Sequence, residues 1–227
     1  MNITTDPDKL VIEGLRAGAS DRSANEAMQG RIVETAERLF RQFGYKKTTV
    51  ADIADALNMS TANIYRFFAS KGAITEAVTR KVIQDHAALV QAAITAPGLS
   101  APDKLTAFVR VSFAHIRERC LMDNRMHEMV QTAMEKSWPV ISAHKQAMRR
   151  LMTQIIAEGA SAGEFDVADP ALAAACFHNS MSVTLHPVLI ENCMRDGEDV
   201  EALIGPMLAY AFRALGASRD AGSRPLA

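Results

Sequence analysis

The stretch from residue 49 to 68, TVADIADALNMSTANIYRFF, constrains this chain most, because it has the pattern of two short helices joined by a tight turn. Its first half places apolar residues at i, i+3, i+4 and i+7, the spacing of one helical face: Val50, Ile53, Ala54 and Leu57. The second half repeats this spacing with Ile64, Phe67 and Phe68. Between the halves, Asn58 tolerates the left-handed backbone that ends a helix, and Ser60 is a preferred N-cap. The pattern predicts a helix-turn-helix unit of the kind that reads DNA.

The exposed face of the second predicted helix carries side chains that can reach a DNA duplex. We predict that Thr61, Asn63 and Arg66 approach base edges. We predict that Tyr65 lies along the DNA backbone or against a thymine methyl group. A purely structural interpretation stays open, in which Tyr65 packs on the first helix and Thr61 or Asn63 only caps a helix end.

Charge is distributed unevenly along the chain. Residues 31–71 hold seven basic and four acidic side chains, whereas the whole chain has a net charge of −1. A positive segment on an otherwise negative chain suits a protein that contacts a polyanion with one part only. Within this segment we predict that Lys47, Thr49 and Lys71 contact DNA phosphates.

Residues 31–74 resemble the N-terminal part of the TetR family of bacterial transcriptional regulators. The matching elements, in chain order, are Phe40 to Gly44, Thr48-Thr49, Ile53-Ala54, Asn58-Met59-Ser60, Tyr65 to Phe68 and Ser70-Lys71. Two positions depart from the family pattern: Asn58 stands where glycine is usual, and Phe67 stands where a histidine is frequent. The resemblance implies a homodimer joined by a four-helix bundle, a palindromic operator in double-stranded DNA, and an unknown small-molecule effector bound in a larger C-terminal lobe.

Composition favours an all-α fold independently of this resemblance. Of the 227 residues, 48% are hydrophobic but only 6% are aromatic, and methionine is abundant with 12 residues. Slim side chains with few glycines and prolines are typical of packed helices. No window of about 18 apolar residues and no secretory signal pattern occur, so we expect a cytoplasmic protein without a membrane contact. The three cysteines, Cys120, Cys176 and Cys193, lack the spacing of a metal or redox motif.

Breaks in the pattern divide the chain into an N-terminal domain of three helices and a larger helical domain, about nine helices in all. The expected segments are a mobile arm (1–28), a helix-turn-helix domain (29–75), an effector-binding and dimerisation domain (76–216) and a frayed tail (217–227). The expected helices flanking the helix-turn-helix unit and filling the larger domain are 29–43, 71–96, 102–121, 124–136, 139–162, 170–194 and 199–215.

The last expected helix carries an apolar stripe that is broader than one packing contact requires. By resemblance to the TetR family, it contributes to the dimer together with the helix before it. We predict that the interface includes Leu203, Met207, Ala211 and Phe212. The alternative is that this stripe belongs to the core of the single chain.

The middle of the chain holds all six histidines, many methionines and the single tryptophan. Methionine adapts to apolar ligands, so this region is the candidate effector pocket, and its composition favours a large apolar or weakly polar organic compound. Candidate pocket residues are His115, Met126, His127, Trp138 and His178. The histidine spacings do not close a metal-ligand set, and we expect no metal and no cofactor.

The sequence contains no nucleophile elbow, phosphate loop or zinc-protease motif, so an enzyme is not expected. The leading hypothesis is a repressor that a small-molecule inducer releases from DNA by shifting the long helix after Lys71, a mechanism implied by the resemblance. Two alternatives stay open. One is an activator or an effector-free regulator controlled by a protein partner. The other is a redox or metal sensor that uses its cysteines.

Overall fold

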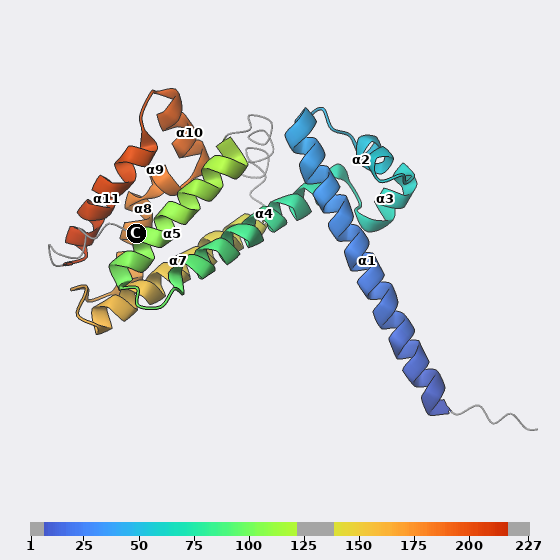
Figure 1. The fold of residues 1–227 in the computed structure, drawn as a ribbon, viewed down its shortest axis with the longest axis horizontal. Coiled ribbons are helices and arrows are strands. Elements are labelled where there is room, and N and C mark those ends of the chain that lie inside the picture. Colours follow the sequence, from blue (N-terminus) through green and yellow to red (C-terminus); the bar gives the residue numbers. More distant parts are fainter. Residues whose placement is uncertain (1–6, 122–138, 218–227) are drawn as a thin grey trace, which may run out of the picture. The chain divides into compact units, whose positions relative to one another are not determined.

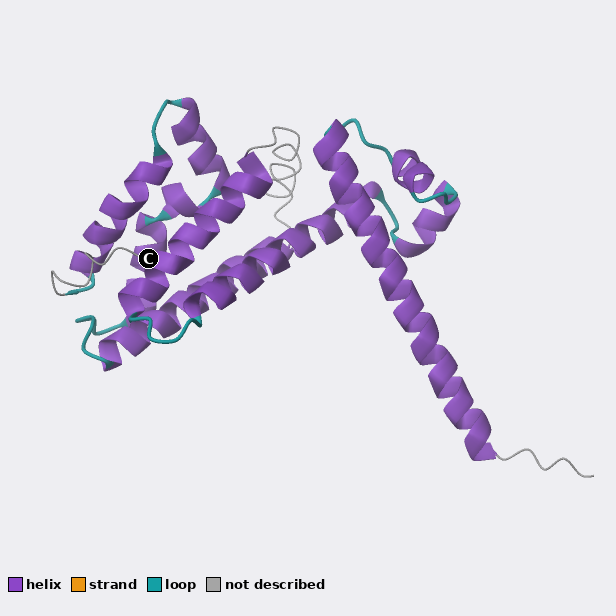
Figure 2. Ribbon diagram, in the orientation of Figure 1, coloured by secondary structure: helices purple, strands orange, loops and turns teal. Residues whose placement is uncertain are grey.

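The computed structural model describes residues 7–121 and 139–217, with side chains described for 23–119 and 139–217. This part of the chain forms helices and loops and contains no strand (Figure 2). It confirms the expected all-α fold. None of the described helices combines the length and the apolar character needed to cross a membrane.

The chain divides into two compact units, Met1–Val78 and Thr79–Ala227. The smaller unit contains α1 (Pro7–Phe43), α2 (Val50–Ala56), α3 (Thr61–Phe67) and the first residues of α4 (Lys71–Ile94) (Figure 1). Helix α4 therefore begins in the smaller unit and continues into the larger one. The expected boundary after residue 75 lies close to the observed one.

Helix α1 corrects the expectation that the first helix begins near residue 29, because it already begins at Pro7. The segment before residue 29 lacks the apolar stripe from which amphipathic helices are identified, so its composition suggested an arm. It is nevertheless rich in alanine and other good helix formers and contains no proline after Pro7. Among the side chains described from residue 23 on, the first buried one is Ile32, where α1 packs on α2 and α3.

The larger unit surrounds its own hydrophobic core. It contains the rest of α4, then α5 (Ala101–Ile116), a π-helical turn η1 (Arg117–Leu121), α7 (Pro139–Ser161), α8 (Pro170–Ser180), α9 (Ser182–Leu185), α10 (Pro187–Arg195) and α11 (Val200–Ala214). The core is formed mainly by apolar side chains of α4, α5, α7, α8 and α11. Phe212 of α11 lies between Phe165 and Phe177, with ring centroids 6.4 and 6.5 Å away.

The expected single helix over 170–194 is wrong in its continuity, because this region forms α8, α9 and α10. Pro187 lacks the backbone N–H that a continuing helix needs, and it stands at the first position of α10 instead. The short α9 precedes it and ends at His186, whose backbone is extended. The chain bends here, and this bend places His186 at a cavity described below. The helix expected over 124–136 lies outside the described residues.

Close packing of α7 against α5 depends on Gly159. A Cβ atom at this position would lie 2.6 Å from the Cβ atom of Ala101 and 2.4 Å from the ring of Phe165. Both neighbours are buried, so neither side chain can move away without disturbing the core.

We therefore expect Gly159→Ala to destabilise the larger unit by about 1–3 kcal/mol, as overpacking of a dense core does. Gly30→Ala is the matched control, because Gly30 is also helical but has open space around its Cβ position. That change should leave stability unchanged or raise it slightly. Chemical denaturation followed by far-ultraviolet circular dichroism measures both variants. Equal effects of the two substitutions would contradict this account.

Candidate DNA-binding and effector sites

The helix-turn-helix unit is held at both helix starts by side-chain caps. Thr49 accepts a hydrogen bond from the Asp52 backbone N–H, and the Asp52 carboxylate accepts one from the Thr49 backbone N–H at 2.7 Å. These bonds and the Thr49 hydroxyl hold the pKa of Asp52 below its usual value. Ser60 caps α3 by accepting from the Asn63 backbone N–H at 3.2 Å. Asn58 has a φ of 54°, which confirms the prediction of a left-handed backbone at the end of α2.

The buried and exposed residues of α3 separate in the way that DNA reading requires. Ile64 is fully buried against the other helices of the smaller unit, whereas Tyr65 is 50% exposed and Arg66 is exposed. Thr61 and Asn63 are half-buried. These four residues, predicted to face DNA, therefore stand on one short helix with at least part of each side chain accessible. Their individual contacts stay predictions.

Two of the three predicted phosphate contacts have partners within the smaller unit. The Lys71 ammonium group donates to the backbone oxygen of Tyr45 at 2.5 Å and lies 4.3 Å from the centroid of the Tyr45 ring. The Thr49 hydroxyl donates to the Asp52 carboxylate at 2.8 Å. Lys47 is exposed. This Lys71 contact was not predictable from the sequence, because Tyr45 lies 26 positions away and belongs to no recognisable motif.

The apolar residues of α11 divide between the core and the surface. Ala211 and Phe212 are only 5% and 6% exposed and belong to the core of the single chain. This burial corrects their assignment to a dimer interface, because their side chains offer almost no surface to a partner. Leu203 is 37% exposed and Met207 is partly buried. Tyr210, which was not predicted, is 67% exposed on the same helix.

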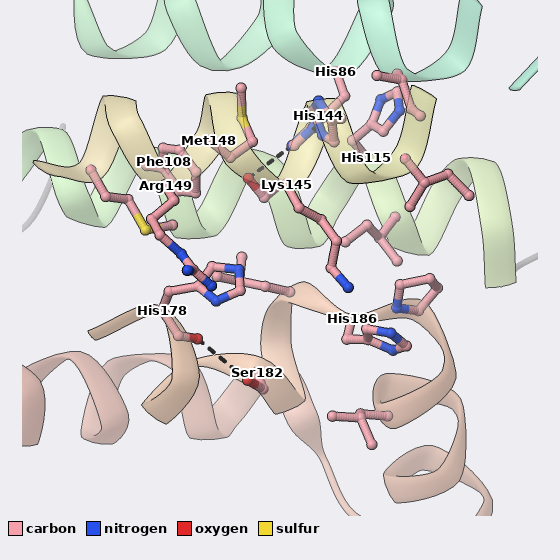
Figure 3. Close-up of a pocket in the computed structure, with 18 of the residues that line it drawn as sticks. His86, Phe108, His115, His144, Lys145, Met148, Arg149, His178, Ser182 and His186 are labelled. Atoms are coloured by element: carbon pink, nitrogen blue, oxygen red, sulfur yellow. Dashed lines mark hydrogen bonds between the residues drawn. The ribbon is translucent and has the colours of Figure 1, made fainter. Parts of the chain in front are cut away.

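A cavity of about 360 Å³ lies within the larger unit, between α4, α5 and α7 on one side and α8 to α10 on the other (Figure 3). Its apolar lining includes Ile83, Phe108, Met148, Met152 and Leu185. Five imidazoles and two cations also line the cavity: His86, His115, His144, His178, His186, Lys145 and Arg149. The volume lies at the lower end of the range of about 300–1,000 Å³ that is typical of small-molecule sites.

Three imidazoles gather where α4, α5 and α7 meet. Nδ1 of His86 lies 3.0 Å from Nε2 of His144, and Nε2 of His86 lies 2.9 Å from the Ser112 hydroxyl. The ring of His115 lies 5.3 Å from that of His86. Burial, with a smaller contribution from His144, lowers the pKa of His86 to about 3. Burial is also the main cause that lowers the pKa values of His115 and His144, so this cluster is neutral at physiological pH.

Two further imidazoles, His178 and His186, lie across the cavity from this cluster, and both cations extend from α7 toward them. Lys145 and Arg149 are one turn apart on α7, and Figure 3 shows Arg149 pointing toward His178 and Lys145 toward His186. Both cationic residues are exposed, at the edge of the cavity. Burial is the main cause that lowers the pKa values of His178 and His186, and Lys145 adds to both shifts.

The structure places two of the predicted pocket residues, His115 and His178, at the cavity. Met126, His127 and Trp138 lie outside the described residues. Sequence reasoning missed His86, His144, Lys145 and Arg149, although the α7 residues carried a signal. His144, Lys145, Met148, Arg149 and Met152 recur at the spacing of one helical face, which is the pattern of a mixed polar and apolar pocket wall.

The described residues contain no group of histidines, cysteines and carboxylates arranged to hold a metal ion. His86 is instead hydrogen-bonded on both ring nitrogens. Of the two cysteines with described side chains, Cys176 is exposed and Cys193 is partly buried, and both are free thiols.

Comparison with known proteins gives two family matches. Residues 32–78 match the model described as "Bacterial regulatory proteins, tetR family", and residues 101–203 match the model described as "Tetracyclin repressor-like, C-terminal domain". The first match covers the helix-turn-helix unit, and the second covers most of the cavity wall.

The HTH-type transcriptional repressor KstR2 of Rhodococcus jostii (strain RHA1) is 31% identical to this chain over 98 residues. The alignment covers 43% of this chain and 48% of the relative, so it spans about half the length of that protein.

Among solved structures, a tetR-family regulatory protein from Rhodococcus RHA1 is similar with a TM-score of 0.56 and 23% identity, over 84% of this chain and 97% of that one. A transcriptional regulator from Cytophaga hutchinsonii ATCC 33406 has a TM-score of 0.65 and 21% identity, over 81% of this chain and 96% of that one. At these identities the two structures support the fold alone.

The contact between Lys71 and Tyr45 gives a prediction about stability. Lys71→Met keeps the apolar stem of the side chain but leaves the Tyr45 oxygen without its charged donor, so we expect the smaller unit to lose about 1–2 kcal/mol. Lys47→Met, at an exposed lysine, should change stability by less than about 0.5 kcal/mol. Urea denaturation compares the two. A Lys71 variant as stable as the Lys47 variant would show that the contact is unimportant.

The buried His86 gives a prediction about pH. Above its ordinary pKa of 6.5, His86 is neutral in both the folded and the unfolded chain. Between pH 6.5 and about 3 only the unfolded chain takes up this proton, so the free energy of unfolding falls by up to about 1.4 kcal/mol per pH unit. His86→Gln keeps hydrogen-bonding groups but does not titrate. We expect its stability to fall less steeply than that of the parent chain between about pH 7 and 5, and parallel curves would contradict this.

Proposed function

We propose that this chain, which belongs to the TetR family of bacterial regulatory proteins, is a sequence-specific DNA-binding transcriptional regulator. The observation that carries the proposal is the capped α2–turn–α3 unit, in which Ile64 is buried while Tyr65 and Arg66 are exposed. A helix fixed on one face and accessible on the other is what insertion into a major groove needs.

We further propose that the chain acts as a homodimer on a palindromic operator. Helices α10 and α11 carry exposed large apolar side chains, among them Leu189, Met194, Leu203 and Tyr210. Two copies related by a two-fold axis would bury these residues against one another in a four-helix bundle. The same axis would relate the two α3 helices, and a palindromic site matches that symmetry.

The cavity of the larger unit is the proposed effector site, and α4 is the proposed link to DNA. Helix α4 lines the cavity with Ile83 and His86, and the same helix begins at Lys71, which contacts Tyr45 in the smaller unit. A ligand that moves the cavity segment of α4 would therefore act on the helix that holds the DNA-reading unit. Repression is relieved only if the ligand binds the two states with unequal affinity.

The first experiment is binding of the full chain to a genomic fragment library at two salt concentrations, followed by sequencing of the bound DNA and measurement of the protein mass in solution. We expect a palindromic motif bound by a dimer or by a pair of dimers. Salt-sensitive binding without a motif, or no binding, would contradict the proposal.

Two variants then separate the predicted roles in the smaller unit. Asn63→Ala should cost about 1–3 kcal/mol on the preferred operator and change the preference among operators. Lys47→Met should weaken all operators alike and reduce the slope of log affinity against log salt by about one. Lys104→Met, a substitution in the larger unit, is the control and should change neither. If both variants of the smaller unit shift every operator by the same factor, the division between base and phosphate contacts is wrong.

A further inference from the structure

The lining of the cavity combines apolar walls with basic groups and contains no carboxylate among the described residues. Phe108, Met148 and Met152 provide apolar surface, while Lys145 and Arg149 provide two positive charges at the edge. The carboxylate of Asp85, on α4, does not face these two cations. It lies 3.2 Å from both the Lys81 ammonium and the Arg119 guanidinium groups.

The two cations, Lys145 and Arg149, lie on the same helix at the edge of the cavity. Residues four positions apart on a helix lie on one face, so Lys145 and Arg149 leave α7 on the same face. Figure 3 shows them directed at His186 and His178. In the described part of the chain neither cation forms a salt bridge.

Polar atoms on this side also lack partners. Nδ1 of His178 and Nδ1 of His186 are buried and have no hydrogen-bond partner among the described residues. Buried polar atoms are nearly always paired in proteins, because leaving one unpaired costs its full desolvation penalty. Two orphaned ring nitrogens on the wall of one cavity therefore point to a polar group of a ligand.

We propose that the effector is a carboxylic acid with an apolar body, whose carboxylate lies among Lys145, Arg149, His178 and His186 and whose body packs against Phe108 and Met152. This inference rests on the proposed function insofar as it treats the cavity as the effector site. It replaces the expectation of an apolar or weakly polar compound, because methionine and alanine content does not reveal the basic groups of the lining.

A carboxylate fits this group of residues better than a neutral or cationic group does. An ammonium group would meet two like charges and no carboxylate among the described lining residues. A neutral amide would pair with ring nitrogens but gain nothing from the charges of Lys145 and Arg149. A carboxylate accepts several charge-assisted hydrogen bonds and can engage the planar Arg149 guanidinium group with both oxygens.

The protonation states of His178 and His186 show which residues supply the positive charge at this site. Burial and the charge of Lys145 lower the pKa values of both His178 and His186, and Arg149 acts on His178 as well. Both rings are therefore neutral at physiological pH, and each can donate one N–H to a carboxylate. The fixed positive charge comes from Lys145 and Arg149, so selectivity for an acid over its amide depends on these two residues.

The test measures ligand binding to the full chain in the absence of DNA. The probes are decanoate, phenylbutyrate and adamantaneacetate, each compared with its primary amide, which has nearly the same shape without the charge. Thermal shift identifies the acids that bind, and titration calorimetry gives their affinities. We expect at least one acid to bind about tenfold or more tightly than its amide. Amides that bind as tightly as their acids, or a panel in which no acid binds, would overturn the proposal.

Charge-removing variants test the assigned residues. Lys145→Met and Arg149→Met should each weaken binding of the acid by about tenfold and leave binding of the amide unchanged. Arg150→Met is the matched control, since Arg150 is the next residue on α7, is exposed and does not line the cavity. Loss of affinity for acid and amide alike, or an equal loss in the Arg150 variant, would contradict the assignment.

A separate measurement distinguishes this inference from the proposed function. The acid that binds is added to the complex of the chain with its operator DNA, and DNA affinity is recorded. Release of DNA supports both the site and its regulatory role. Acid binding that leaves DNA affinity unchanged supports the carboxylate site but contradicts the effector role. If an amide releases DNA as effectively as its acid, the carboxylate site is contradicted and the regulatory role of the cavity is supported.

Discussion

The hydrogen bonds of His86 join three helices of the larger unit beside its cavity. One ring nitrogen of this α4 residue lies 3.0 Å from His144 of α7, and the other lies 2.9 Å from Ser112 of α5. Burial keeps this ring neutral by lowering the pKa of His86 to about 3, and in a neutral ring one nitrogen donates and the other accepts. A polar contact of this kind has directional geometry, which apolar packing lacks, so it fixes how three helices meet.

Helix α4 carries both His86, at the cavity, and Lys71, in the smaller unit. The same helix begins at Lys71, whose ammonium group contacts Tyr45 in the smaller unit, and it reaches His86 about four turns later. A helix transmits displacement because its backbone hydrogen bonds resist bending except at a proline, a π-bulge or an inserted side chain. Helix α4 contains no proline. In the proposed function, α4 is the element through which a change at the cavity would act at Lys71.

The sequence predicted the elements whose signals are local and missed those that depend on distant residues. The α2–turn–α3 unit was predictable because its apolar spacing, Asn58 and Ser60 lie within 20 residues, and each has its own physical reason. The first part of α1 was not predictable, since its sequence shows no periodic apolar stripe. The cavity was predicted only in part, because His86, Ser112 and His144 are brought together from positions up to 58 apart. In α11, periodicity identified an apolar stripe but did not show which of its residues are buried in the core of the single chain. Ala211 and Phe212 are buried there.

The two units use basic residues under different electrostatic conditions. Lys47 and Arg66 of the smaller unit are exposed, and attraction between such cations and DNA phosphates arises largely from release of counterions, so it weakens steeply as salt rises. Lys145 and Arg149 stand at the edge of a cavity with apolar walls, where part of the surrounding solvent is replaced by protein. Charges that approach one another beside such walls are screened less than charges in open solution. If both proposed sites are correct, DNA binding and acid binding must differ in their salt dependence, because a polyanion brings counterions to release and a single carboxylate does not.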